Sequence, residues 1–100
     1  MSETRRPKFT LGQVVATPGA LEAIRDARQR PDEFLARHVS GDWGELHEED
    51  RRLNNLALTD GSRILSAYVT SKAERIWVIT EAADDSRRRA STCLLLPSEY

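Results

Sequence analysis

The residues between positions 38 and 43 hold the most suggestive group of reactive side chains in the sequence. His38 ends a segment of helical apolar spacing, and Asp42 and Trp43 follow it in a Gly-Asp-Trp-Gly turn. A histidine at a helix C-terminus could serve as a general acid or base, because the helix dipole favours its charged form. The interpretation we favour is structural: His38 caps the helix carbonyls and Trp43 fills the core beneath the turn. Asp42 and Trp43 are also candidate binding residues.

A second histidine, His47, directly precedes three acids at positions 48–50. Imidazole and carboxylate groups are ligands for divalent metals, but a metal site needs side chains that converge on one point. Adjacent residues at the start of a helix point in different directions. We therefore predict a solvated helix N-terminus, in which the acids complement the helix dipole, and no bound metal. The sequence also lacks a glycine-rich phosphate-binding loop, so we expect no cofactor.

Arg63 and Glu81 occur on two strand-like segments nearer the C-terminus and could form a catalytic group with His38. Helices followed by an antiparallel sheet resemble the plan of the barnase and RelE-like ribonucleases. In such enzymes, Glu and His transfer protons at a 2′-hydroxyl while Arg holds the phosphate. The chemistry fits less well than the plan, because these enzymes commonly use a histidine and none occurs here after His47. A small ribonuclease or toxin is therefore an alternative interpretation.

The only compact basic run in the sequence consists of Arg87, Arg88 and Arg89. Such a run could bind the phosphates of a nucleic acid. For that role it would have to share one face with the basic residues near the N-terminus, namely Arg5, Arg6 and Lys8. Two aspartates directly before the run weaken its positive potential, so we favour an exposed, mobile loop over residues 82–90. Nucleic-acid binding without chemistry is a third interpretation.

Three strand-like segments must position most of these side chains. Residues 75–81 form the densest apolar, β-branched and aromatic run, and similar runs at 63–70 and 91–96 flank it. We predict that the three segments form an antiparallel meander. A further short strand is predicted at Gln13–Ala16. Cys93 lies in the last apolar run, which predicts a small buried hydrophobe.

Three short helices are predicted between the first strand and the meander. Thr17 as N-cap and Pro18 at the first helical position mark the start of the first helix. Pro31 starts the second helix and Gly41 ends it. The third helix begins at about Glu48. Its inner stripe is expected to comprise Leu53, Leu56, Ala57 and Leu58.

The predicted fold class is α+β, with a short N-terminal strand and three helices packed on a C-terminal three-stranded antiparallel meander. One hundred residues suffice for one domain, which we place at residues 9–100, after a flexible tail at residues 1–8. Both faces of the predicted strands are largely apolar. Either the helices wrap both faces, therefore, or one face meets a partner.

The charge balance argues against a strongly basic nucleic-acid-binding domain, because 15 basic and 16 acidic residues give a net charge of -1. The single cysteine excludes an internal disulfide and is typical of a reducing compartment. The sequence has no apolar run long enough to span a membrane and no charged-then-apolar leader. These features predict a soluble, cytoplasmic protein with no membrane partner.

Several longer stretches resemble a group of small bacterial proteins that are carried on plasmids and integrated mobile elements. The stretches are LGQVVATPGAL at 11–21, FLARHVSGDWG at 34–44, RILSAY at 63–68, IWVITE at 76–81 and LLPSEY at 95–100. The group has no established activity, so the resemblance implies an association with mobile elements and no particular reaction. The loop at 82–90 is longer and more basic here than in that group.

These observations together favour a small protein-interaction module over an enzyme. The prediction depends on the lack of a catalytic motif and on a sheet with more apolar surface than one covered face requires. The partner would be another protein or a second copy of the chain in a homodimer. The small ribonuclease and the nucleic-acid-binding accessory protein are the alternatives.

Overall fold

The computed structural model describes residues 6–100 of the chain. Within these residues, strands and helices follow one another in the order β1 (Gln13–Ala16), α1 (Pro18–Asp26), α2 (Pro31–Val39), α3 (Glu48–Asp60), β2 (Ile64–Val69), β3 (Arg75–Thr80) and β4 (Ser91–Leu95). A short 3-10 turn, η1 (Pro97–Glu99), ends the chain and was not predicted. The predicted α+β class is confirmed.

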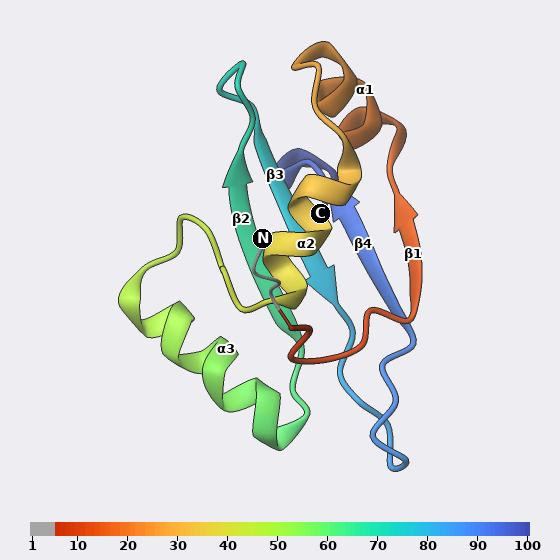
Figure 1. Cartoon of the computed structure of the whole chain (residues 1–100), viewed down its shortest axis with the longest axis vertical. Helices are drawn as coiled ribbons and strands as arrows, with labels where there is room; N and C mark the ends of the chain where they lie inside the picture. Colours follow the sequence, from red (N-terminus) through yellow and green to blue (C-terminus); the bar gives the residue numbers. More distant parts are fainter. Residues whose placement is uncertain (1–5) are drawn as a thin grey trace.

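The strands form one sheet with the order β1-β4-β3-β2 (Figure 1). β2, β3 and β4 are antiparallel neighbours, which confirms the predicted meander. β1 pairs with β4 in parallel, so the complete sheet is mixed rather than purely antiparallel. A parallel pair needs a long crossover connection, and the helices between β1 and the meander provide it.

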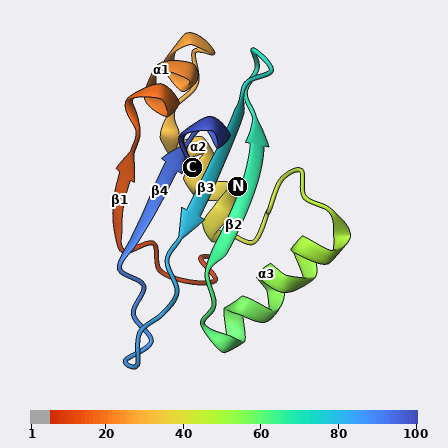
Figure 2. The ribbon, with the colours of Figure 1, turned by 180° about the vertical axis from the view of Figure 1, so that it is seen from behind.

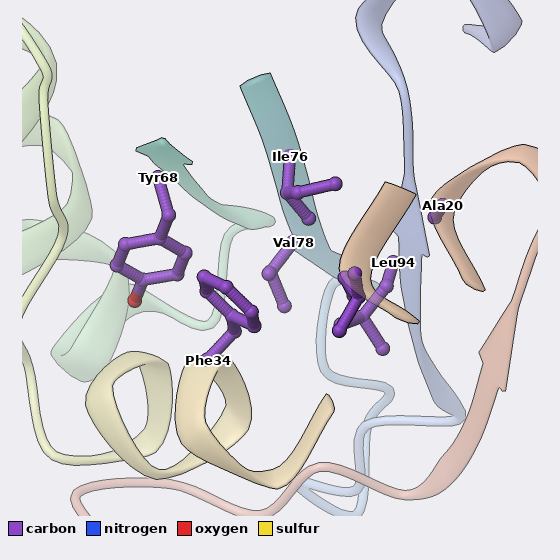
Figure 3. Packing of buried hydrophobic residues seen from close by; sticks show 7 residues of the cluster. Ala20, Phe34, Tyr68, Ile76, Val78 and Leu94 are labelled. Atoms are coloured by element: carbon purple, nitrogen blue, oxygen red, sulfur yellow. The ribbon is translucent and has the colours of Figure 1, made fainter. Parts of the chain in front are cut away.

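Helices α1 and α2 cover one face of the sheet (Figure 1). α1 begins as predicted, because Thr17 Oγ1 accepts a hydrogen bond from the backbone N–H of Ala20 at 3.1 Å. α2 turns Phe34 towards the sheet, where its ring centroid lies 5.7 Å from that of Tyr68 (Figure 3). The buried core cluster on this face comprises Ala20, Ile24, Phe34, Tyr68, Ile76, Val78 and Leu94.

Helix α3 lies beside the β2 edge of the sheet and covers neither face (Figures 1 and 2). This position corrects the predicted inner stripe of α3 only in part, because Ala57 is buried and Leu58 packs against a core cluster, as predicted. Leu53 and Leu56 are 52% and 51% exposed, whereas Asn54 and Ala57 are buried. The reason is that α3 contacts an edge of backbone N–H and C=O groups, which a carboxamide can satisfy and an alkyl chain cannot.

The predicted flexible tail lies only partly within the described residues, because residues 1–5 are outside them. The backbone N–H of Lys8 donates to the carbonyl oxygen of Val39 at 2.7 Å, so Lys8 already belongs to the folded domain. Between residues 6 and 100, no helix combines the length and the apolar character needed to cross a membrane.

Candidate functional site

The two faces of the sheet differ in what covers them. Side chains alternate between the faces along each strand, so every second residue points away from α1 and α2. We call this second side the open face; in the three-stranded meander it carries Leu65, Ala67, Trp77, Ile79, Cys93 and Leu95. Figure 2 shows that none of α1, α2 and α3 lies in front of it and that the short 3-10 turn η1 lies over one end. The ring of Tyr100, which follows η1, packs edge-on against Trp77 at a centroid distance of 5.6 Å.

A groove of about 1140 Å³ runs between the open face and α3. Leu65, Ala67 and Trp77 line it from the sheet, and Leu53 lines it from α3. Leu53 therefore belongs to the surface of the groove, where the sequence pattern had predicted a core residue. The groove combines an apolar floor with one half-exposed apolar wall.

The edge of β2 beside the groove is closed by hydrogen bonds. The Asn54 carboxamide pairs with both backbone groups of Leu65: Nδ2 donates to the Leu65 oxygen at 2.7 Å, and the Leu65 N–H donates to Oδ1 at 3.2 Å. Further along, the Ala67 N–H donates to the Trp43 oxygen at 3.1 Å, and the Glu45 N–H donates to the Ala67 oxygen at 2.7 Å. The outward backbone groups of Leu65 and Ala67 are thus already paired, so an added strand could not bond to them.

Gly44 allows the loop before α3 to approach β2 this closely. Its φ is 78°, and a Cβ atom there would lie 2.0 Å from the carbonyl oxygen of Ala67. Arg51 of α3 holds the same loop, donating from Nη2 to the Gly44 oxygen at 2.6 Å and from Nε to the Leu46 oxygen at 3.1 Å. The loop therefore forms a fixed wall of the groove.

Charged side chains divide between the two walls of the groove. Arg63 and Arg75 line it from the sheet, and Glu45 and Asp50 line it from the loop and α3. None of the ion pairs within residues 6–100 involves Arg63 or Arg75. Arg63 donates to the hydroxyl of Tyr100 at 2.7 Å, which is a neutral acceptor. The sheet side is consequently basic, whereas the α3 side carries both signs, because Arg51 of α3 lines the groove together with Glu45 and Asp50.

His38 is fully buried on the other side of the sheet, between α2 and the strands. Its Nδ1 lies 2.6 Å from Ser66 Oγ, and its Nε2 lies 2.8 Å from Thr80 Oγ1. Thr80 Oγ1 lies 2.7 Å from Thr92 Oγ1, whose hydroxyl donates to the carbonyl oxygen of Leu11 at 2.7 Å. A hydrogen-bonded chain therefore joins α2 to three strand side chains and to the segment before β1.

The chemistry of these donors assigns each proton in the chain. Thr92 uses its single hydroxyl hydrogen on the Leu11 oxygen, so Thr80 must donate to Thr92. The Thr80 oxygen then accepts from Nε2–H of His38, and Nδ1 of the neutral ring accepts from the Ser66 hydroxyl. Burial and, to a smaller extent, the positive charge of Arg89 lower the pKa of His38 to about 3, which agrees with a neutral ring.

The predicted catalytic group does not assemble. His38 is buried on the helix-covered side, whereas Arg63 lines the groove on the opposite side and Glu81 is exposed. A general base must come within hydrogen-bonding reach of its substrate, and His38 is sealed beneath α2. His38 has a structural role, as predicted. The predicted capping of helix carbonyls is wrong, because the ring bonds to strand hydroxyls instead.

Trp43 and Asp42 take structural positions. Trp43 is 3% exposed, stacks on Phe9 at a centroid distance of 6.2 Å and donates from Nε1 to Asn55 Oδ1 at 3.0 Å. Its predicted place in the core is confirmed, and it cannot serve as an exposed binding residue. Asp42 accepts a hydrogen bond from Arg37 Nε at 2.7 Å, and this contact raises the pKa of Arg37.

The loop at 82–90 was predicted to be exposed, but one arginine of the run at 87–89 is buried. Arg89 is only 8% exposed, and burial lowers its pKa. Its guanidinium donates at 2.8–3.0 Å to the carbonyl oxygens of Ala57, Ser62 and Glu81. Because Ala57 lies in the last turn of α3, Arg89 caps that helix. Arg87 and Arg88 are exposed, and Arg87 donates to the Thr59 oxygen at 3.3 Å.

A shared phosphate-binding face could therefore not include Arg89. Arg6 and Lys8 line a small hollow with Gly41 and Asp42, and Arg5 lies outside the described residues. His47 is the N-cap residue of α3 and is exposed. Among residues 6–100, no three His, Cys, Asp or Glu side chains converge as metal ligands would.

Cys93 and Trp77 are less buried than the apolar strands predicted, and both are of intermediate exposure on the open face. Burial still raises the pKa of the Cys93 thiol, so this thiol is not activated as a nucleophile. The predicted buried cysteine is corrected to a partly exposed one. Its face of the sheet has none of α1, α2 and α3 above it, which is the physical reason.

Sequence reasoning missed two sets of polar residues, one in the core and one at the groove. The first is the buried hydroxyl set of Ser66, Thr80 and Thr92, which stand at helix-facing positions between apolar residues. Polar residues that interrupt one apolar face of several strands were the available signal for this set. The second is Asn54, whose side chain pairs with the β2 edge as a neighbouring strand would. Nothing in the sequence pattern indicated this role.

Comparisons of the chain with protein-family models, with curated proteins and with solved structures find no match. The function has to be inferred from the geometry of the molecule.

Proposed function

We propose that the protein is a non-enzymatic interaction module whose binding surface is the groove between α3 and the open face. The observation that carries the proposal is that apolar side chains from α3 and from the sheet line the same groove. Leu53 from α3 faces a floor that includes Leu65 and Trp77. An apolar surface with a charged rim is typical of a protein-binding site.

Closure of the β2 edge explains why Asn54 is buried, but it gives no reason for the two half-exposed leucines of α3. α3 buries the polar Asn54 and leaves Leu53 and Leu56 half exposed, although burial of a leucine contributes about 1.5–3 kcal/mol to folding. Single exposed leucines are common on protein surfaces. Here, however, Leu53 opens onto an uncovered sheet face, so a partner that fills the groove would bury both surfaces at once.

Two further parts of the proposal concern the cellular compartment and the association with mobile elements. We propose a cytoplasmic protein, since a partly exposed free thiol at Cys93 suits a reducing compartment. The association with mobile elements remains a prediction from the resemblance alone. Catalysis is not part of the proposal, because His38, Arg63 and Glu81 do not share a cleft.

The proposal is tested by capturing partners from a lysate of the host with the tagged chain and two variants. Leu53→Asp places a charge in the groove, and Leu21→Asp places one at a leucine of 45% exposure on α1, outside the groove. We expect one protein that survives nuclease treatment to be captured by the wild-type chain and by Leu21→Asp, and to be lost with Leu53→Asp. Melting temperatures should agree among all three.

Equal capture by both variants would contradict the proposal, and so would a captured nucleic acid that disappears on nuclease treatment. The partner is either a different protein or a second copy of the chain, and light scattering of the purified chain distinguishes these two cases. A dimer that dissociates with Leu53→Asp and persists with Leu21→Asp would identify a second copy as the occupant of the groove.

A further inference from the structure

We propose that the occupant of the groove is an amphipathic helix of three to four turns, with acidic residues near both ends of the flank that faces the sheet. This inference rests on the proposed function and specifies the partner's chemistry. It follows from three features of the groove: its closed strand edge, its length, and the distribution of charge along it.

The closed edge of β2 decides against an extended peptide. A peptide that adds a strand binds through backbone hydrogen bonds to unpaired edge groups. Asn54 occupies both backbone groups of Leu65, and the loop at 43–45 occupies both backbone groups of Ala67. An occupant beside these residues must satisfy its own backbone, which a helix does internally.

The length of the groove follows from the positions of its two sheet-side arginines. Arg63 directly precedes β2, and Arg75 pairs with Val69 at the other end of β2. Six residues of extended chain separate Arg63 from Val69, which corresponds to roughly 20 Å at about 3.3 Å per residue. A helix of about 13 residues has this length at 1.5 Å per residue.

The charges along the groove favour acidic residues at both ends of that helix. Neither Arg63 nor Arg75 contacts a carboxylate within residues 6–100, so each can receive one from a partner. The opposite wall carries both signs, with Arg51 beside Glu45 and Asp50, so it shows no net preference for acids or bases. The acids are therefore expected on the flank of the helix that faces the two sheet-side arginines.

The apolar residues of the groove lie between the two arginines and suit the apolar stripe of an amphipathic helix. Leu65 and Trp77 form the floor and Leu53 the wall, so the groove offers a central apolar contact with charged ends. A helix with apolar residues at i, i+4 and i+7 presents a stripe of this kind. Helix-in-groove recognition of such stripes is a general binding mode.

The test selects peptides of about 16 residues, one turn longer than the expected contact, from a random phage library. The immobilised proteins are the wild-type chain, Leu53→Asp, the double variant Arg63→Glu/Arg75→Glu and the control Arg25→Glu/Arg88→Glu. The control makes the same change in net charge at exposed arginines outside the groove. Melting temperatures confirm that each variant is folded.

We expect the wild-type chain to enrich helical apolar stripes flanked by Glu or Asp, and Leu53→Asp to abolish their binding. The selected peptide should bind the double variant about 10-fold more weakly and the control within about 2-fold, because each charge reversal affects one rim ion pair. A central proline in the peptide should reduce affinity by at least about 10-fold, because it breaks a helix.

Three outcomes separate this inference from the proposed function. Peptides that require Leu53 but tolerate both the central proline and the reversed arginines would overturn the acidic helix and leave the interaction module intact. Peptides with strand-like alternation would do the same. A library that yields no peptide sensitive to Leu53→Asp would overturn both.

Discussion

The two faces of one sheet are built in opposite ways. The helix-covered face holds a chain of polar groups, His38, Ser66, Thr80 and Thr92, at 0% exposure. The open face, which none of α1, α2 and α3 covers, is apolar and holds the partly exposed Trp77 and Cys93. The helix-covered face thus buries a polar chain within its apolar core, whereas the open face leaves some of its apolar side chains partly exposed.

We infer from this difference that the helix-covered face serves folding, and we propose that the open face serves binding. Every polar atom of the buried chain has a partner, and within residues 6–100 no buried side-chain nitrogen or oxygen lacks one. Such a network is costly to disturb, because each broken bond leaves a buried group unsatisfied. The open face has no such constraint, so substitutions there should change binding more than stability.

The largest expected effect is the loss of the buried imidazole. His38→Ala should lower the free energy of unfolding by about 3–5 kcal/mol, because it creates a cavity, leaves the Ser66 hydroxyl without its acceptor and removes the donor to Thr80. Trp77→Ala removes a larger side chain but should cost only about 1–2 kcal/mol, because that side chain is already partly exposed. Urea unfolding measures both, and a larger loss for Trp77→Ala would reverse the comparison.

Acid should lower the free energy of unfolding, because His38 is held neutral in the folded protein. The unfolded ring binds a proton near its ordinary pKa of 6.5, whereas the folded ring does so only at about 3. The stability contributed by neutral His38 is therefore complete above pH 6.5 and decreases as pH falls towards 3, by up to about 1.4 kcal/mol per pH unit.

Unfolding free energies measured from pH 7 to pH 4 test this dependence against two variants. His38→Gln should flatten the slope in this range, and His47→Gln, at an exposed position, should keep the wild-type slope. Identical slopes for the wild-type chain and His38→Gln would contradict the buried neutral imidazole.

A smaller effect is expected where α3 is fastened to the sheet. Arg89→Met should cost about 2–3 kcal/mol, because three carbonyl oxygens lose a charged donor. Arg88→Met, at the adjacent exposed residue, should stay within about 0.5 kcal/mol of wild type. Equal melting temperatures for the two variants would mean that Arg89 does not hold α3.

The smallest effect on stability is expected at the two exposed leucines of α3, of which Leu53 lines the groove. Leu53→Asp and Leu56→Asp should each change the unfolding free energy by no more than about 0.5 kcal/mol, because both side chains are half exposed. Urea unfolding provides the measurement. A loss above about 2 kcal/mol would show that these leucines contribute to the core, as the sequence pattern had predicted.

The secondary structure was largely predictable because local signals determine it. Thr17-Pro18 marks the start of α1, and Gly61, at a φ of 83°, ends α3. The alternating apolar runs gave β2, β3 and β4. Such signals depend only on neighbouring residues, which explains why they could be read without the fold.

The candidate site was not predictable in the same way. The leucines of α3 have helical spacing whether the helix packs on a face or beside an edge, so the pattern could not reveal that Leu53 lines a groove. Asn54 closes the β2 edge through contacts that only the tertiary arrangement creates. Arg89 looked like a loop residue because its three carbonyl partners are remote in sequence.

The most direct test of the account places a photoreactive amino acid at position 53 in the native host and compares it with the same residue at position 21. We expect a covalent adduct of one defined mass from position 53 and none from position 21, because only the groove is proposed to hold a partner. Adducts of equal yield from both positions, or an adduct from position 21 alone, would contradict the assignment of the groove as the binding surface.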